Sequence, residues 1–315
     1  MTSPSVEILL ATRNGERFLP DLVESLHAQT FRDLRILARD DSSTDATAQI
    51  LREQAEAHSD RFDVLEDADG SLGASGNFSR LISASSAPYV MFCDQDDRWR
   101  PEKVAVTLEA MRIAEARHGT DTPILVHTDL QVADVDLREL GTSFWRYQRL
   151  RPELGERFER VLVQNAVTGC ATMVNRSLLM LAEPVPEEAV MHDWWVALVA
   201  AAFGVVVAVP QATVAYRQHG ENQVGAVGRS PGYLLGRAIG PSSLSDFRES
   251  LRRSVTQAKA FQDRFGNKLT ESQQKALATY VSLDGLSFPA RRGALIRHGL
   301  LRHGLIRNLA LLLRV

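Results

Sequence analysis

The sequence predicts an α/β fold in which helices flank a mostly parallel central sheet. Three observations lead to this prediction. Short apolar runs alternate with segments of helical periodicity through the first hundred residues. The runs at 6–11, 34–38, 62–65 and 89–93 are compact and largely apolar, as strands buried on both faces are. A polar loop follows each main run, and parallel strands with right-handed crossovers gather such loops at one edge of the sheet.

Composition restricts the class of protein. The chain has 315 residues, of which 44% are hydrophobic and 24% charged, as expected for a soluble globular protein of one or two domains. The net charge of -3 argues against a nucleic-acid-binding protein. Cys93 and Cys170 both lie among apolar residues, which favours reduced, buried thiols in a cytoplasmic protein over a disulfide or zinc site. The N-terminus shows no signal-peptide pattern.

The first three strands and their helices can be placed in order. After the strand at 6–11, apolar residues at 19, 22, 23 and 26 predict a helix, with Pro20 tolerated in its first turn. The strand at 34–38 ends in acidic residues, and Ser42 or Ser43 can cap the helix whose apolar positions are 46, 50 and 51. After the strand at 62–65, Gly73 opens a helix with apolar positions 78, 81 and 82.

The fourth strand ends in three carboxylates, those of Asp94, Asp96 and Asp97. Clustered carboxylates repel one another, and a divalent cation with oxygen ligands is the simplest way to keep them ionised. Ligands of open α/β sheets bind beyond the carboxyl ends of the strands, so we interpret the cluster as a metal–diphosphate site. The alternative is a solvated acidic turn. The same edge is expected to collect Thr12, Arg13, Asn14, Glu16, Asp40, Asp41 and Asn77.

The middle of the chain continues the pattern less regularly. A helix begins at Pro101, a strand is predicted at 124–127, and an irregular aromatic stretch covers 137–151. A strand at 169–174 precedes a helix. The uncharged run at 194–209 is too short for a spanning helix, and we interpret it as a buried helix that turns at Gly204 into a strand at 205–209. Pro210 then leads to a strand at 213–216.

The chain changes character after about residue 230. Apolar positions 247, 251, 255 and 258 predict an amphipathic helix, which those at 261, 265 and 269 extend or follow. Residues 286–315 contain six arginines and no acidic residue. This segment is either a peripheral contact with an anionic membrane surface or a helix docked on the main domain or on a second subunit, as in a homodimer.

Six short stretches now stand in a recognisable order over residues 6–222. They are LLATRNG (9–15), RDDSSTD (39–45), CDQDD (93–97), GC (169–170), HDWW (192–195) and YRQH (216–219). Together they resemble the inverting glycosyltransferases of family 2, which have the GT-A fold. More narrowly, the DQDD and HDWW motifs resemble those of the rhamnosyltransferases that build bacterial surface polysaccharide. The resemblance implies a nucleotide-sugar-binding and catalytic domain at 1–228, followed by a helical extension at 229–315.

The resemblance implies a role for each site residue. Thr12, Arg13, Asn14, Glu16, Asp41, Asn77 and Asp94 would surround the nucleotide of a dTDP- or UDP-linked sugar. Asp96, with His219 as a further contact, would hold Mg²⁺ or Mn²⁺ against the diphosphate. Asp193 would be the catalytic base. The extra carboxylate of Asp97 leaves open which pair of carboxylates binds the metal.

The chemistry of sugar transfer explains why such residues are needed. A cation neutralises the leaving diphosphate, an arginine such as Arg13 or Arg217 can add a bidentate contact, and a carboxylate must take the proton of the attacking hydroxyl. Asp193 suits the last task, although a simple helix cap is the alternative. Burial would raise its pKa and a helix N-terminus would lower it. His219 is either a metal-site residue or a structural histidine.

The acceptor side is less defined. The acceptor would be a growing surface polysaccharide or a lipid-linked saccharide. Trp145 and Tyr147 either stack on a sugar face or pack in the core, and Asp129 is expected to line the pocket. The remaining candidates for the sugar pocket are His192, Trp194 and Arg217.

Two other functions compete with this one. A sugar nucleotidyltransferase also places carboxylates and metal at a sheet edge, but it normally has a Gly-rich, basic first loop that residues 12–15 match poorly. An inactive carbohydrate-binding scaffold would be expected to lack either the acidic cluster or Asp193, and both are present.

Overall fold

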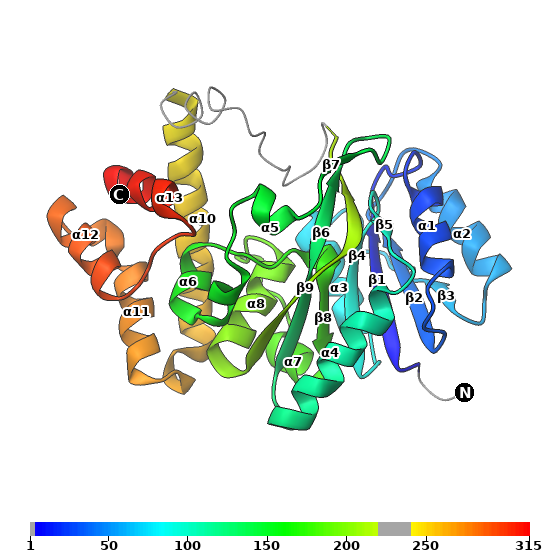
Figure 1. The fold of residues 1–315 in the computed structure, drawn as a ribbon, viewed down its shortest axis with the longest axis horizontal. Coiled ribbons are helices and arrows are strands. Elements are labelled where there is room, and N and C mark those ends of the chain that lie inside the picture. The colour runs from blue at the N-terminus through cyan, green and yellow to red at the C-terminus, as the bar shows by residue number, and fades with distance from the viewer. Residues whose placement is uncertain (1–3, 220–240) are drawn as a thin grey trace.

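The computed structural model describes residues 4–219 and 241–315 and shows one central sheet covered by helices on both faces (Figure 1). The α/β fold and the C-terminal helices agree with the prediction, whereas the proposed domain boundary at 228/229 lies outside the described residues. The strands are β1 (Val6–Thr12), β2 (Leu34–Asp40), β3 (Phe62–Val64), β4 (Tyr89–Asp94), β5 (Arg98–Trp99), β6 (Ile124–Ala133), β7 (Glu139–Gly141), β8 (Thr172–Asn175) and β9 (Val205–Arg217). The α-helices are α1 (Leu19–His27), α2 (Thr47–Ala57), α3 (Gly73–Ala84), α4 (Lys103–His118), α5 (Phe144–Tyr147), α6 (Phe158–Val163), α7 (Arg176–Ala182), α8 (His192–Phe203), α10 (Pro241–Phe265), α11 (Glu271–Val281), α12 (Phe288–Arg297) and α13 (Leu305–Arg314).

The first four strands form a parallel half-sheet in the order β3-β2-β1-β4. Thr12 pairs with Asp40, and Ala11 pairs with Asp94, so the ends of the three longer strands lie level with one another. Alternate residues of β1 face opposite layers: Leu9 packs with the layer that contains α3 and α8, and Leu10 with the layer that contains α1 and α4. The polar loops after β1, β2 and β4 therefore meet at one edge, as predicted.

The second half of the sheet is mixed. β8 pairs antiparallel with both β4 and β6, and β6 pairs parallel with β9. The predicted strand at 169–174 is instead a 3₁₀ turn at Gly169–Ala171 followed by β8. The two predicted strands at 205–209 and 213–216 are one strand, with irregular pairing around Asp129 that absorbs Pro210. β9 thus runs its full length back to the edge where β4 ends.

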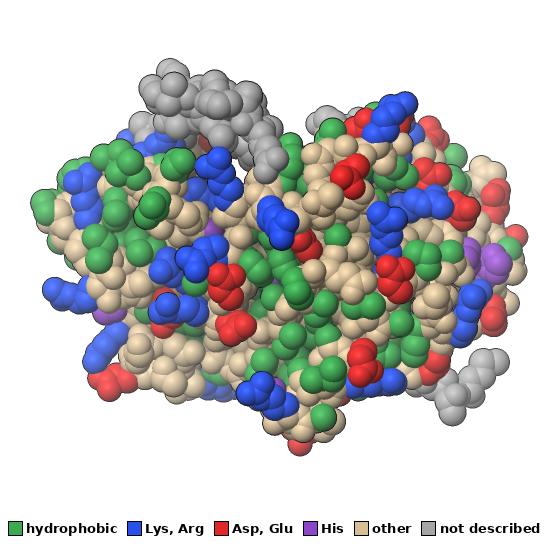
Figure 2. Space-filling model, viewed as in Figure 1, with side chains coloured by type: hydrophobic (Ala, Val, Ile, Leu, Met, Phe, Trp, Pro, Cys, Tyr) green, Lys and Arg blue, Asp and Glu red, His purple; other side chains and the backbone are tan. Residues whose placement is uncertain are grey.

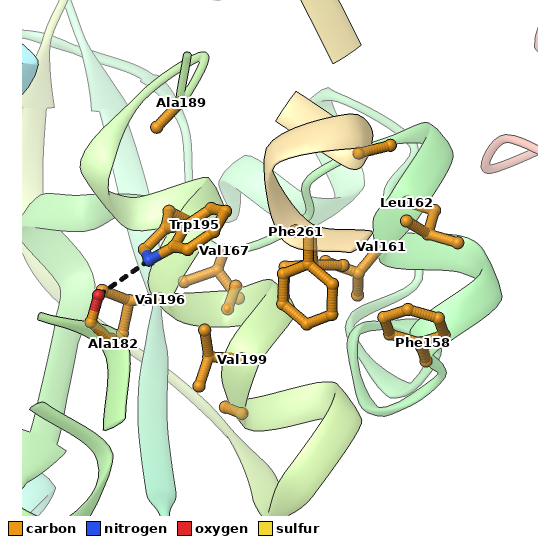
Figure 3. Packing of buried hydrophobic residues seen from close by; sticks show 14 of the residues in the cluster. Phe158, Val161, Leu162, Val167, Ala182, Ala189, Trp195, Val196, Val199 and Phe261 are labelled. Atoms are coloured by element: carbon orange, nitrogen blue, oxygen red, sulfur yellow. Dashed lines mark hydrogen bonds between the residues drawn. The ribbon is translucent and has the colours of Figure 1, made fainter. Parts of the chain in front are cut away.

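Helix α8 joins the sheet to the C-terminal helices, and residues 192–203 form it as predicted from the uncharged run. Trp195 is fully buried, and its indole N–H donates to the carbonyl of Ala182 at 2.9 Å. Figure 3 shows Trp195 near Phe261 of α10, with Val161 of α6 beside them. The amphipathic pattern predicted from residue 247 onward is therefore the face of α10 that packs on α8 and α6.

Gly204 lies where α8 gives way to β9, and a side chain at this position has no room. A Cβ atom there would overlap the carbonyl oxygen of Pro123, which itself accepts a hydrogen bond from the Val205 amide at 2.9 Å. We expect Gly204→Ala to lower the free energy of unfolding by about 3 kcal/mol, the upper range for overpacking. Denaturant unfolding measures this, with Gly293→Ala as the control, because open space surrounds Gly293 in α12. Equal stability of the two variants would contradict the close contact.

Helices α11, α12 and α13 stand at the end of the molecule opposite β3 and α2 (Figure 1). Tyr280 of α11 is fully buried and its hydroxyl lies 2.8 Å from that of Ser254 in α10. Leu295, Leu300 and Leu311 anchor the last two helices in the same apolar cluster. Among the described residues, none of the helices combines the length and the hydropathy required to cross a bilayer.

Candidate active site

A cleft of about 730 Å³ opens at the sheet edge where β1, β2 and β4 end. Its walls also include the N-terminal turns of α3 and α8 and the end of β9. The structure brings many of the predicted site residues into this cleft. They are Thr12, Arg13, Asn14, Asp41, Asn77, Asp94, Asp96, His192, Asp193 and His219. Convergence of residues from positions 12 to 219 on one cavity agrees with a binding site at the carboxyl ends of the strands.

The loop after β1 is held in place by neighbouring loops. The Asn14 amide donates to Ser43, and its side-chain oxygen accepts from the Thr44 amide at 2.8 Å. The Thr12 hydroxyl donates to the Asp40 carboxylate at 3.0 Å. Asn14 has a φ of 49°, a left-handed conformation that asparagine tolerates better than most residues. These contacts hold the loop after β1 in a defined position on the cleft wall.

Asp41 is buried, and its carboxylate accepts hydrogen bonds from the backbone amides of Leu72 and Gly73 at 2.6 and 2.9 Å. Burial opposes ionisation, but these bonds and those from Ser71 and Arg39 outweigh it and lower the pKa of Asp41. The anion thereby holds the loop that leads into α3. The nucleobase of a nucleotide bound in this cleft would meet a carboxylate whose position is already fixed.

Arg39 supports this wall from behind and was given no role in the sequence-based prediction. Its buried guanidinium forms a two-bond ion pair with Asp67, at 2.8 and 2.9 Å, and also donates to Asn77 at 3.3 Å. Bonds to Asp67 raise the pKa of Arg39. The signal for this role was available, because Arg39 directly follows the apolar run Ile36-Leu37-Ala38 and a charged side chain there needs a partner if it is buried.

The acidic cluster divides between the cleft and the interior. Asp94 and Asp96 line the cleft, whereas Asp97 is fully buried and its Oδ1 accepts from the Arg217 amide at 3.1 Å. Burial, with Asp96 and Asp193 nearby, raises the pKa of Asp94 to about 7. Asp96 lies 2.7 Å from the Nε2 of His219. Of the three carboxylates, those of Asp94 and Asp96 are therefore the two on the cleft lining.

The carboxylates of Asp94 and Asp96 on the cleft lining fit a divalent cation. Behind them, oxygen atoms of Asp94 and Asp97 and the sulfur of Cys170 lie within 4.8 Å of one another, and this second group is the more buried of the two. Carboxylate oxygens are the ligands that Mg²⁺ and Mn²⁺ prefer. Both cysteines are free and buried, in agreement with the prediction of reduced thiols.

Asp193 lies on the other wall of the cleft, in the first turn of α8. Its Oδ2 accepts from the Gly169 amide at 2.9 Å, and Oδ1 accepts from the Asn165 side chain at 3.3 Å. The residue at the N-cap position is Met191, so Asp193 is not the cap of this helix. Burial raises the pKa of Asp193 to about 6, against the opposing effect of amide bonds from Gly169 and Trp194. Of the two opposing effects on the pKa of Asp193 that the sequence left open, burial is therefore the larger.

His192 packs behind this carboxylate. Its ring stacks on Phe78 with the centroids 3.8 Å apart and meets the edge of Phe92 at 4.8 Å. Burial lowers the pKa of His192 to about 3, so the ring is neutral at physiological pH. Phe78 had been assigned only to the apolar face of α3, yet it also lines the cleft.

Arg217 was one of two candidate arginines for the diphosphate and a candidate for the sugar pocket, and the structure places it outside the cleft lining. Its guanidinium donates to the carbonyls of Asp96 and Val135, each at 2.9 Å, and to the carboxylate of Asp21 at 3.0 Å. The side chain also lies over the Phe18 ring at 4.6 Å. Arg217 thus supports the turn that carries Asp96 and is not part of the cleft lining.

Asp129 was expected to line the pocket, and this prediction is wrong because Asp129 is not part of the cleft lining. Strand β6 continues to Ala133, so Asp129 lies within a strand and not at its end. Its carboxylate accepts from Ser143 and from the Trp145 amide, which fixes the start of α5. Trp145 is buried with its ring 5.3 Å from His127, outside the lining of the cleft. Tyr147 is also outside that lining and lies against Gly141.

Two further candidates do not reach the cleft. Glu16 accepts from the Ala46 amide at 2.9 Å and so caps the start of α2. Trp194 donates from its indole to the Val161 carbonyl at 2.6 Å and packs toward the C-terminal helices. Conversely, Gln95 was passed over as a spacer between carboxylates. Its amide both accepts from the Arg13 N–H at 2.7 Å and donates to the Arg13 carbonyl at 2.8 Å, clamping the first loop.

Comparison with known proteins identifies the family. Residues 7–179 match the model of glycosyl transferase family 2. The chain is 26% identical over 228 residues to the dTDP-rhamnosyl transferase RfbG of Shigella flexneri, covering 69% of this chain and 74% of that protein. The chain spans less than half of the length of the next curated relatives it matches.

Two solved structures share the fold at low sequence identity. S. aureus TarS 1-349, in complex with UDP-GlcNAc, superimposes with a TM-score of 0.53 at 12% identity, covering 92% of this chain and 83% of that one. The mannosyltransferase PcManGT from Pyrobaculum calidifontis, in complex with GDP-Man and Mn²⁺, gives 0.55 at 16% identity, covering 95% and 74%. Because the family model matches more than half of the chain, this protein belongs to glycosyl transferase family 2 and is a glycosyltransferase.

Proposed function

We propose that the enzyme transfers L-rhamnose from dTDP-rhamnose, with inversion, to a hydroxyl of a growing surface polysaccharide or a lipid-linked saccharide. The observation that carries the proposal is the placement of Asp193 and of Asp94 with Asp96 on the lining of one cleft. The similarity to a dTDP-rhamnosyl transferase supports this choice of donor. A UDP-linked sugar is the second candidate, since TarS, which shares the fold, binds UDP-GlcNAc.

The acidic side of the cleft would grip the diphosphate. Asp96 and Asp94 would hold Mg²⁺ or Mn²⁺, which supplies neutralisation of the charge that develops on the leaving diphosphate. His219 lies 2.7 Å from Asp96 and either orients this carboxylate or joins it as a ligand. Arg13, half-exposed on the cleft wall and 3.6 Å from Asp41, is the cation placed to meet the phosphates.

Asp193 would accept the proton of the attacking hydroxyl. A sugar hydroxyl is a weak nucleophile at neutral pH, and a carboxylate with a pKa of about 6 is ionised there while remaining more basic than an exposed aspartate. The Gly169 amide and Asn165 orient the carboxylate. Attack on the anomeric carbon opposite the diphosphate then inverts its configuration and requires no covalent enzyme intermediate.

The state of the two cysteines supports a cellular compartment for the enzyme. We place the enzyme in the cytoplasm, because its two buried, unpaired cysteines suit a reducing compartment. Location at the inner face of the membrane would bring it to a lipid-linked acceptor.

A panel of donors tests the proposal. Release of nucleoside diphosphate from dTDP-rhamnose, UDP-glucose, UDP-GlcNAc and GDP-mannose is measured with Mn²⁺, with and without a lipid-linked saccharide extract. We expect dTDP-rhamnose to give the highest acceptor-stimulated rate. A preference for a UDP-sugar would change the donor and leave the reaction class intact. Formation of pyrophosphate from a nucleoside triphosphate and a sugar phosphate would instead identify a nucleotidyltransferase.

A further inference from the structure

Helix α13 presents an apolar face that no described part of the chain covers. Leu305, Leu309 and Leu313 recur every four residues and are 88%, 60% and 61% exposed, with Ile306 beside them at 68%. The opposite side of the helix is docked, since Leu311 is fully buried. Figure 2 shows hydrophobic side chains gathered over the region of α12 and α13. Exposed apolar groups this concentrated on one helix indicate a contact surface, whereas single exposed leucines do not.

The segment that carries this face is basic and contains no acidic residue. Residues 286–315 contain six arginines and no aspartate or glutamate. The side chain of Arg307 reaches from α13 to the carbonyl of Gln148 at 2.6 Å, which joins the helix to the segment 146–160. That neighbouring segment adds five arginines against three glutamates. Figure 2 shows blue side chains next to the hydrophobic ones.

The arginines act on one another. Burial, and then the neighbouring Arg302 and Arg149, lower the pKa of Arg307, and burial together with Arg314 lowers that of Arg302. A segment with six arginines and no acidic residue repels a second copy of itself across a two-fold interface, so self-association is disfavoured. A partner that combines an apolar layer with negative charge satisfies both parts of the surface.

We propose that the exposed face of α13 docks on an anionic lipid bilayer, parallel to the membrane plane. The four apolar side chains, Leu305, Ile306, Leu309 and Leu313, enter the headgroup boundary, and the exposed Arg297 of the same basic segment meets lipid phosphate groups. Ile296, 58% exposed on α12, extends the apolar contact. The inference concerns a surface remote from the nucleotide cleft and does not depend on the choice of donor sugar.

Sedimentation with vesicles tests this docking in the full chain, without any nucleotide sugar. We expect binding to vesicles that contain phosphatidylglycerol and little binding to phosphatidylcholine alone. Binding should weaken when salt rises from about 0.1 to 1 M, where the Debye length falls from about 10 to 3 Å. The double variant Leu309→Glu and Leu313→Glu should lower the affinity at least about tenfold, because it places charge on the apolar face.

A matched control separates docking from general hydrophobicity. The double variant Ile113→Glu and Met180→Glu changes two isolated apolar residues, 61% and 71% exposed, on α4 and α7. We expect this control to bind as the unaltered chain does. Equal loss in both variants, or none in either, would overturn the proposal. A dimer in solution that Leu309→Glu with Leu313→Glu converts to a monomer, without lipid binding, would assign the face to a second copy. Circular dichroism of both variants excludes unfolding as the cause.

Discussion

Asp193→Asn is expected to abolish sugar transfer and to leave donor binding unchanged. Asparagine keeps the shape of the side chain and an oxygen that accepts from the Gly169 amide, whose donor atom lies 2.9 Å from the carboxylate. Only the capacity to take the hydroxyl proton is lost, which costs about 10²–10⁴ in kcat. Calorimetric titration with the donor and a transfer assay measure the two properties separately. Asp60→Asn, which neutralises an exposed carboxylate far from the cleft, serves as the control. Turnover comparable to that of this control would remove Asp193 from the mechanism.

The pH dependence of transfer follows from the same residue. A base must be deprotonated to act, and burial raises the pKa of Asp193 from 3.8 to about 6. With Mn²⁺ saturating, so that the proposed ligand Asp94 stays ionised, kcat should therefore be constant above that value and fall about tenfold for each pH unit below it. An exposed aspartate would keep the plateau down to about pH 4. A profile flat to pH 4 would contradict the buried environment of Asp193.

Asp96→Asn is expected to remove the metal dependence of donor binding. The carboxylate lines the cleft and lies 2.7 Å from His219, so the amide preserves the shape and the contact but not the charge. Loss of a ligand should weaken metal affinity by roughly 100-fold or more, the upper end of what loss of an outer-shell partner costs. Nucleoside diphosphate is titrated into both proteins with Mn²⁺ and again with EDTA.

The EDTA measurement is the internal control for this variant. Both proteins should bind the nucleotide about equally without metal, because the contacts that we propose for the nucleobase come from the cleft lining around Asp41. Only the unaltered chain should gain affinity when Mn²⁺ is added. An equal gain in Asp96→Asn would show that the cation is held elsewhere, with Asp97 and Cys170 as the nearest other donors.

The parallel half of the sheet, and the residues at its edge, could be predicted because local pattern decides both. Compact apolar runs fix strands, and parallel strands end on one side, so Thr12, Asp41 and Asp94 had to converge. The distinction between Asp96 and Asp97 could not be predicted. Adjacent side chains point in different directions, and which of them faces solvent depends on the packing of β9 against this turn.

The misplaced residues depend on long-range pairing. Asp129 was expected at a strand end, but β6 is lengthened by pairing with β9, a partner about 80 residues away in the sequence. Arg217 was expected at the phosphates because it is a cation near the edge. Its guanidinium is instead drawn inward by backbone carbonyls that only the folded chain supplies. Neither the β6–β9 pairing nor the carbonyl partners of Arg217 can be predicted from the local periodicity of the sequence.

The bond from the Gly169 amide to Asp193 has an evolutionary consequence. A peptide N–H belongs to every residue type except proline, so nearly all inherited replacements at position 169 retain the donor that orients the carboxylate we propose as the base. Bulk is the remaining constraint, since a Cβ atom there would approach His192 to 3.1 Å. Substitutions at position 169 should therefore lower the turnover rate gradually with side-chain size, whereas substitutions at position 193 should abolish turnover.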